Sequence, residues 1–208
     1  MADWKQTLKD VWHFVWYEDS WASWFVNLGL AFVIIKYIVY PLLGFILGTS
    51  LPIVAVVSGS MDHGGDFDSW WNSMIGKDLT ADKVVAQANF YANYGIAKNT
   101  FLSYSFKNGF NKGDIMILYS AKSVNIGDVI VFPVEGRLDP IIHRVISMDE
   151  KSYTTKGDAN PGSASFEQNI PKDSVVGKAL IRVPLLGWVK IGFVWLVQST
   201  VKFIGGIL

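Results

Sequence analysis

The sequence contains no cysteine and only three histidines among its 208 residues. The missing thiols exclude a disulfide framework, a cysteine nucleophile and thiolate metal ligands. Three histidines (His13, His63 and His143) do not predict a multi-histidine metal site. Charged residues make up 17%, and 18 basic residues balance 18 acidic ones, so no net field attracts nucleic acid. Hydrophobic residues make up 50%, which indicates a membrane-associated protein. The composition as a whole predicts neither metal dependence nor nucleic-acid binding.

One long stretch that is almost free of charge indicates where the chain meets a lipid bilayer. Between Trp21 and Val57 the one charged residue is Lys36, and a bilayer span needs about 20 apolar residues. We therefore predict a transmembrane helix over residues 23–48, ended by the polar residues that lead to Pro52. A span that begins only after Lys36 is the alternative. The apolar run starts too late and is too long for a cleaved targeting peptide, so we expect an anchor.

The basic residues on either side of this helix predict its orientation. Lys5 and Lys9 precede it, and no lysine or arginine follows it before Lys77. The positive-inside rule therefore places residues 1–22 in the cytoplasm as a short tail. We expect residues 49–183 to lie outside the cytoplasm, at a cell membrane.

Residues 184–208 form a second apolar segment, with Lys190 and Lys202 as its only charges. As a helix, it either spans the bilayer or lies in the interface through its tryptophan and phenylalanine side chains. The sequence leaves both arrangements open.

Residues 49–183 predict a β-rich domain of antiparallel type. Short β-branched runs are separated by turns that contain Gly, Asp, Asn and Pro, and no helix alternates with each strand. The predicted strands are Pro52–Ser58, Asp114–Tyr119, Asp128–Pro133, Ile141–Met148, Tyr153–Lys156 and Val175–Val183.

The block 62–112 interrupts this pattern as an insertion. It is richer in Trp, Asn, Ala and Lys, and the stretches Phe67–Lys77 and Thr80–Tyr94 are predicted to be helical. Its residues Trp70 and Trp71 either rest on the membrane interface or form a small satellite core. The sequence favours neither, and it does not reveal what the insertion does.

A turn with two serines follows the first predicted strand. Ser58-Gly59-Ser60-Met61 comes directly after Pro52–Val57, behind the anchor. At a strand end, with Gly59 free to adopt unusual backbone angles, Ser60 can present a nucleophilic hydroxyl. Ser58 lies on the same face of an extended chain and can help to hold an oxyanion. By itself the tetrapeptide is more typical of an ordinary turn.

Two further elements can supply such a serine with a base and an acid. In the strand Ile141–Ile146, alternation places His143 on a half-buried face, where an imidazole can act as a general base near neutral pH. Asp158 follows the next strand in a turn and can accept a hydrogen bond from His143, which would set the tautomer of the ring. Taken alone, the two residues are typical of a core histidine and a turn-capping aspartate.

Four short sequence motifs, in their order along the chain, resemble those of signal peptidase I of the archaeal and endoplasmic-reticulum type. They are Pro52–Met61, Gly127–Phe132, Ile142–Ile146 and Thr155–Asp158, which span most of residues 52–183. The resemblance implies a mainly β, signal-peptidase-like antiparallel domain with an N-terminal transmembrane helix, a partly helical insertion and a C-terminal apolar helix. It also implies a membrane-bound serine endopeptidase that removes signal peptides from secreted preproteins without a cofactor.

The resemblance also assigns roles to single residues. It implies that Ser60 is the nucleophile and that Ser58 supplies the oxyanion-hole hydroxyl. His143 is then the general base, at a position where the bacterial branch has a lysine, and Asp158 is its acidic partner. The expected substrates are preproteins bound as an extended chain beside a strand, with small residues before the scissile bond. The lipid bilayer, secretion machinery and partner membrane helices are the other expected partners.

The chain departs from the family pattern at its acidic residues. Members often have a second aspartate beyond the Asp158 turn, and here residues 161–167 contain Glu167 instead. We expect Asp158 to be the main acid, with Glu167 as a possible second acidic residue, because a loop carboxylate is usually solvated. Two other functions stay open. One is a Ser-Lys peptidase with a lysine such as Lys156 as its base, and the other is an inactive β domain that binds exported chains.

Overall fold

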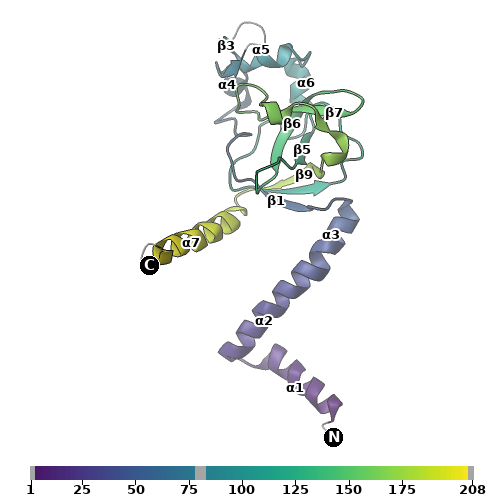
Figure 1. The fold of residues 1–208 in the computed structure, drawn as a ribbon, viewed down its shortest axis with the longest axis vertical. Helices are drawn as coiled ribbons and strands as arrows, with labels where there is room; N and C mark the ends of the chain where they lie inside the picture. The colour runs from purple at the N-terminus through teal and green to yellow at the C-terminus, as the bar shows by residue number, and fades with distance from the viewer. Residues whose placement is uncertain (1–2, 78–82, 206–208) are drawn as a thin grey trace. The chain divides into compact units, whose positions relative to one another are not determined.

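Polar caps start both helices of the N-terminal unit, Met1–Ile46. The computed structural model describes residues 3–77 and 83–205. The side chain of Asp3 caps α1 (Trp4–Tyr17), and the side chain of Ser20 caps α2 (Trp21–Ile34), each by accepting a hydrogen bond from a backbone N–H of the first turn. Both helices are seen in Figure 1.

The second helix continues through a π-helical turn, η1 (Ile35–Val39), into α3 (Tyr40–Leu47). The wider turn has a local cause, because Pro41 has no backbone N–H and its ring would clash with a carbonyl one α-helical turn earlier. Lys36, the single charge of this segment, lies over the rings of Phe32 and Tyr37 at 5.6 and 5.3 Å.

The continuous helix Trp21–Leu47 has 27 residues and contains an 18-residue stretch with a mean hydropathy of 2.2, none of which is buried inside the structure. Among the described residues, it is the one helix long and apolar enough to cross a membrane.

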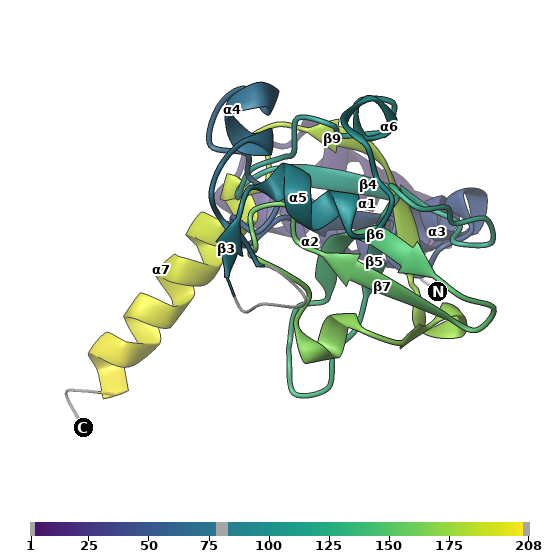
Figure 2. The ribbon, with the colours of Figure 1, turned by 90° about the horizontal axis from the view of Figure 1, so that it is seen from above.

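The second unit, Leu47–Leu208, is built on an antiparallel sheet of seven strands in the order β1-β4-β9-β5-β6-β7-β8. The predicted mainly β fold is therefore confirmed, and the short strand β8 was not predicted. The strands are β1 (Ile53–Ala55), β4 (Ile115–Tyr119), β5 (Val129–Phe132), β6 (Ile141–Met148), β7 (Ser152–Lys156), β8 (Ile170–Pro171) and β9 (Gly177–Val183). After β9 the chain continues into α7 (Trp188–Gly205), the C-terminal helix (Figure 2).

The insertion leaves the sheet domain and returns to the same point, where a bridge pairs Asp62 with Gly109. Gly109 has a φ of 66°, and a Cβ there would lie 2.2 Å from the carbonyl oxygen of Met61, so only glycine fits this closure. Figure 1 shows the insertion elements gathered at one end of this unit. They are α4 (Phe67–Trp71), β2 (Gly76–Lys77), β3 (Val84–Val85), α5 (Gln87–Ala92) and α6 (Lys98–Leu102).

The two helices predicted for the insertion are wrong in extent. The stretch Phe67–Lys77 is helical only over Phe67–Trp71, and the stretch Thr80–Tyr94 is helical only over Gln87–Ala92. A two-stranded hairpin joins the two helices, and residues 80–82 of the second prediction lie outside the described residues.

Trp70 and Trp71 are 3% and 5% exposed, so they belong to a satellite core rather than to an exposed face. This core also contains Phe90, Tyr91, Phe101 and, from β6, Ile146.

Candidate active site

Ser60 lies in the turn that follows β1, and its Oγ is 2.7 Å from Nε2 of His143. Because His143 lies within β6, backbone pairing with Ile130 of β5 holds the position of its Cα. The ring is 4% exposed, so it is held by packing as well as by the sheet. The structure therefore brings together the predicted nucleophile and the predicted base, which are 83 residues apart in the chain.

Nδ1 of His143 makes a hydrogen bond to Oε1 of Glu167, which closes η2 (Ser165–Glu167), a short 3₁₀ helix. The other carboxylate oxygen accepts from the backbone N–H of Ala164 at 2.8 Å, which fixes the orientation of the side chain. An ionised carboxylate can only accept, so the proton of the neutral ring lies on Nδ1. The lone pair of Nε2 then faces the hydroxyl of Ser60, as removal of its proton requires.

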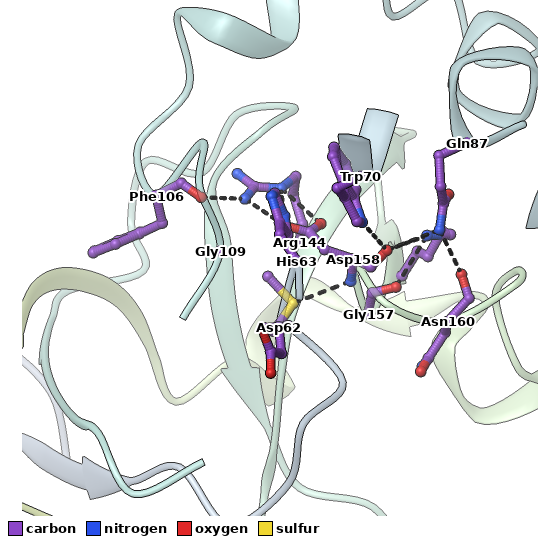
Figure 3. Close-up of polar contacts among 12 residues, drawn as sticks. Asp62, His63, Trp70, Gln87, Phe106, Gly109, Arg144, Gly157, Asp158 and Asn160 are labelled. Atoms are coloured by element: carbon purple, nitrogen blue, oxygen red, sulfur yellow. Dashed lines mark hydrogen bonds and ion pairs between the residues drawn. The ribbon is translucent and has the colours of Figure 1, made fainter. Parts of the chain in front are cut away.

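Asp158 does not contact His143, and the contact predicted between them is not formed. Its carboxylate instead pairs with the guanidinium of Arg144, with Nη2 at 2.7 Å from Oδ2. It also accepts from Tyr91 Oη at 3.0 Å. Its Oδ2 lies 3.0 Å from Nε2 of His63, which Figure 3 shows beside Asp158. Burial raises the pKa of Asp158, but Arg144 and His63 outweigh this effect and hold the pKa well below its usual range.

Strand alternation explains why the two acids have separate partners. His143 and Arg144 are neighbours in β6, so their side chains point to opposite faces of the sheet. Arg144 is paired with Lys156 of β7 and shares its face, and Asp158 follows Lys156 by two residues. The carboxylate of Asp158 thus falls on the face of Arg144, whereas Glu167 approaches the face of His143.

The structure places the other sequence-based candidates for the base away from Ser60. His63 is buried, and its ring stacks on Trp70 with 3.8 Å between centroids. The Nζ of Lys156 donates to the backbone carbonyls of Gly157 and Asp158 at 3.0 and 3.1 Å, and it lies over the rings of Phe90 and Tyr91 of the insertion. Burial lowers the pKa of Lys156 to about 7, but its contacts do not make it the partner of Ser60.

Ser58 completes the group around the nucleophile. Its Oγ lies 3.1 Å from Oγ of Ser60. When Ser60 donates its own proton to His143, the proton in this second pair has to come from Ser58. The hydroxyl of Ser58 therefore donates to Oγ of Ser60, the attacking oxygen.

A groove opens over this group. It is about 430 Å³ in volume, and Ser58, Ser60 and His143 line it together with the end of β1 and the loop between β5 and β6. Within residues 3–77 and 83–205, no cluster of three or more His, Asp or Glu side chains could hold a metal ion. The hydroxyl of Ser60 and the imidazole of His143 line the groove, and the buried carboxylate of Glu167 contacts the imidazole on its other nitrogen. This is the set that serine hydrolases use for nucleophilic attack.

Comparison with curated proteins finds relatives that share one description. No family model matches the chain. It is 38% identical over 102 residues to the signal peptidase complex catalytic subunit SEC11C of Homo sapiens, which covers 43% of this chain and 53% of that protein. It is 28% identical over 119 residues to the catalytic subunit SEC11 of Colletotrichum graminicola, which covers 50% and 69%. The SEC11 subunit of Saccharomyces cerevisiae is 37% identical over 86 residues, which covers 36% and 52%.

The resemblance to signal peptidase I of the archaeal and endoplasmic-reticulum type is thus confirmed by relatives named as catalytic subunits of the signal peptidase complex. The chain spans about half the length of most of the curated relatives it matches.

Proposed function

We propose that this chain is a membrane-anchored serine endopeptidase that removes signal peptides from exported preproteins. The observation that carries the proposal is the continuous chain of hydrogen bonds from Ser60 through His143 to Glu167. Similarity to SEC11 catalytic subunits supplies the class of substrate. In this proposal Ser60 is the nucleophile, His143 the general base and Glu167 the residue that orients the base.

In the proposed reaction, Nε2 of His143 takes the proton of Ser60 while Oγ attacks the scissile carbonyl carbon. The buried carboxylate of Glu167 stabilises the imidazolium that forms, and His143 then gives the proton to the leaving amine. The acyl bond to Ser60 breaks when a water molecule, deprotonated by the same imidazole, attacks it. The cycle ends with Ser60 and neutral His143 restored.

Negative charge develops on the carbonyl oxygen during both attacks, and Ser58 is the proposed donor to it. Its hydroxyl lies 3.1 Å from the nucleophilic oxygen, close enough to turn toward the oxyanion once Ser60 has bonded to the substrate. The reorganisation needed is a rotation of this one hydroxyl, because its oxygen already lies beside the attacking atom.

The position of β1 supports binding of an extended substrate. β1 is an edge strand of the sheet and pairs with β4 along one side. The groove begins at Ala55 and Val57, at the end of this strand, and reaches Ser60. A preprotein segment that adds to the free side of β1 would bring its scissile bond to Ser60, with main-chain hydrogen bonds giving affinity.

The N-terminal unit supports attachment to a membrane. We propose that Trp21–Leu47 spans the bilayer, with the N-terminus in the cytoplasm and the sheet domain outside. Trp12 and Trp16 on α1 are 60% and 64% exposed, as expected for side chains that rest in the headgroup region. Because the relatives are named as subunits of a complex, partner membrane proteins are part of the proposal.

The proposal is tested by incubating the purified full-length chain with a preprotein in detergent and determining the cleavage point by mass spectrometry. We expect one cut after a small residue, and no cut with the Ser60→Ala variant. Equal processing by the wild type and Ser60→Ala would show that another group cleaves the bond.

A further inference from the structure

We infer that the insertion 62–112 positions the turn Gly157–Asn160, the Asp158 turn, against the catalytic pair, with Trp70 and Gln87 as positioning residues. This inference rests on the proposed function, because it assigns the insertion a part in the reaction at Ser60.

The insertion holds the backbone of the Asp158 turn through two side-chain donors. Trp70 Nε1 and Gln87 Nε2 donate to the carbonyl oxygen of Asp158 at 3.1 and 2.9 Å. Gln87 Nε2 also reaches the carbonyl oxygen of Asn160 at 3.2 Å, so one amide bridges both halves of the turn (Figure 3). Trp70 and Gln87 come from the separate helices α4 and α5, which pack together in the satellite core.

The insertion also holds the carboxylate of the turn. His63 and Tyr91 are both 3.0 Å from an oxygen of Asp158, and Arg144 of β6 covers the remaining side. Arg144 in turn donates to the carbonyl of Phe106, near the end of the insertion, at 2.9 Å. The buried charges and the backbone contacts thus link the insertion, the turn and β6 into one network.

The opposite side of the Asp158 turn contacts the catalytic pair. The N–H of Ala159 donates to the carbonyl oxygen of Ser60 at 2.8 Å, and the N–H of Asp158 lies 3.3 Å from the sulfur of Met61. At Gly157 a Cβ would lie 2.8 Å from both Nε2 of His143 and the carbonyl oxygen of Ser60. A movement of this turn would therefore move the backbone of Ser60 and press on the ring of His143.

The contact of the Asp158 turn with Ser60 and His143 affects catalysis because it sets the distance between them. The transfer of a proton from Ser60 to His143 depends on a separation of 2.7 Å, and errors of about 1 Å in such geometry cost on the order of 10²-fold in rate. Both groups contact this turn. The insertion supplies two of the side-chain donors that hold its main chain, Trp70 and Gln87, beside Nζ of Lys156. The two tryptophans that could have rested on the membrane interface, Trp70 and Trp71, are buried.

Gln87 allows a test that separates positioning from stability. It is fully buried, its Nε2 makes the two hydrogen bonds to the turn, and its Oε1 has no partner within the described part of the chain. In Gln87→Met the side-chain length is kept, both donors are lost, and no hydrogen bond to the amide oxygen is removed. We therefore expect the melting temperature to change little while the turn loses its bridge.

Trp70 has a matched control in its neighbour. Trp70 and Trp71 lie in the same short helix and the same buried aromatic core, but Trp70 donates to Asp158 whereas Trp71 stacks on Tyr91 with 5.6 Å between centroids. Trp70→Phe keeps a ring and loses the donor, and Trp71→Phe removes a similar volume without touching the turn.

The experiment uses the full-length chain in detergent and the variants Gln87→Met, Trp70→Phe and Trp71→Phe. A serine-directed acylating agent titrates the active molecules, so that kcat for a preprotein is expressed per reactive serine. We expect Gln87→Met and Trp70→Phe to lower kcat by about tenfold to 10²-fold with KM nearly unchanged, and to slow acylation in parallel. Trp71→Phe should keep the wild-type kcat even where its melting temperature falls.

Wild-type kcat per reactive serine in both Gln87→Met and Trp70→Phe would overturn the inference and leave the insertion as structural support. Equal losses in Trp71→Phe would overturn it too, because the loss would then follow the packing rather than the hydrogen bonds. Acylation of the wild type without preprotein cleavage would instead count against the proposed function. The acylation rates of the variants would still decide the role of the insertion in that case.

Discussion

Glu167 is the carboxylate that contacts His143, and its second oxygen accepts a hydrogen bond from the N–H of Ala164, three residues before it in the chain. The capping geometry of the 3₁₀ helix η2 thus places the carboxylate of Glu167 beside His143, with one oxygen at Nδ1. The longer glutamate side chain reaches from the loop to the sheet, where an aspartate at the same position would be one methylene shorter. We therefore expect a substitution of Glu167 to act on catalysis and a substitution of Asp158 to act mainly on stability.

We predict that Glu167→Gln lowers kcat by about 10²- to 10⁴-fold with little change in stability. The amide keeps the shape of the side chain but favours the wrong tautomer of His143, as in other triads. Steady-state kinetics on a preprotein would measure the loss. Activity within a few-fold of the wild type would remove Glu167 from the mechanism.

Asp158→Ala should act mainly on folding. The substitution leaves the guanidinium of Arg144 buried without its carboxylate, and breaking such a pair costs about 3–5 kcal/mol. Denaturant unfolding followed by tryptophan fluorescence would report the loss. A stable Asp158→Ala protein with abolished kcat would instead return Asp158 to the role expected from the sequence.

Ser58→Ala should lower kcat by about 10²-fold, as expected when one oxyanion donor is lost. KM should change little, because the oxyanion exists only after attack. Ser58→Thr, which keeps a hydroxyl, is the matched control and should recover part of the rate. A loss seen only in KM would mean that Ser58 binds the substrate rather than the transition state.

His143→Ala should abolish cleavage, whereas His63→Phe should keep it within about tenfold. The phenylalanine ring can keep the stack on Trp70 and loses only the contact to Asp158, which Arg144 and Tyr91 continue to hold. Cleavage rates per titrated serine would compare the two variants. Loss in His63→Phe with activity retained in His143→Ala would exchange their roles.

Lys156 gives the stability a pH dependence with a definite sign. Its pKa is about 7 in the folded chain because of burial, against 10.5 for an ordinary lysine. Between these values the unfolded chain binds a proton that the folded chain does not. The free energy of unfolding should therefore rise with pH from about 7 upward, by at most about 1.4 kcal/mol per pH unit. Lys156→Met should abolish this rise. The control variant Lys151→Met, at an exposed lysine, should retain it. The same slope in both variants would show that another group is responsible.

The absence of cysteine permits a clean test of topology. Single substitutions Gln6→Cys in α1 and Lys151→Cys in the sheet domain would each give the chain one thiol at an exposed position. A membrane-impermeant maleimide applied to intact cells should label Lys151→Cys, and it should label Gln6→Cys only after permeabilisation. The reverse pattern would invert the proposed orientation and count against access to exported preproteins.

Local patterns in the sequence were sufficient for the sheet and for the long apolar helix. Period-two runs of β-branched residues between turns specify strands wherever they are buried, and a long uncharged run predicts a helix apolar enough to cross a membrane. The roles of Ser60 and His143 came from the motifs that resemble the family. Each of these motifs lies at a strand or strand end, whose position follows from the local pattern.

The choice between Asp158 and Glu167 needed the tertiary structure. It depends on the register that pairs Arg144 with Lys156, which decides the face of the sheet that each side chain meets. It also depends on the 3₁₀ helix η2, which brings the carboxylate of Glu167 to Nδ1 of His143. Neither contact is local, and no periodicity predicts where a loop carboxylate comes to rest. The donors Trp70 and Gln87 were likewise out of reach of the sequence, because only the packing of α4 and α5 brings them to the carbonyl of Asp158.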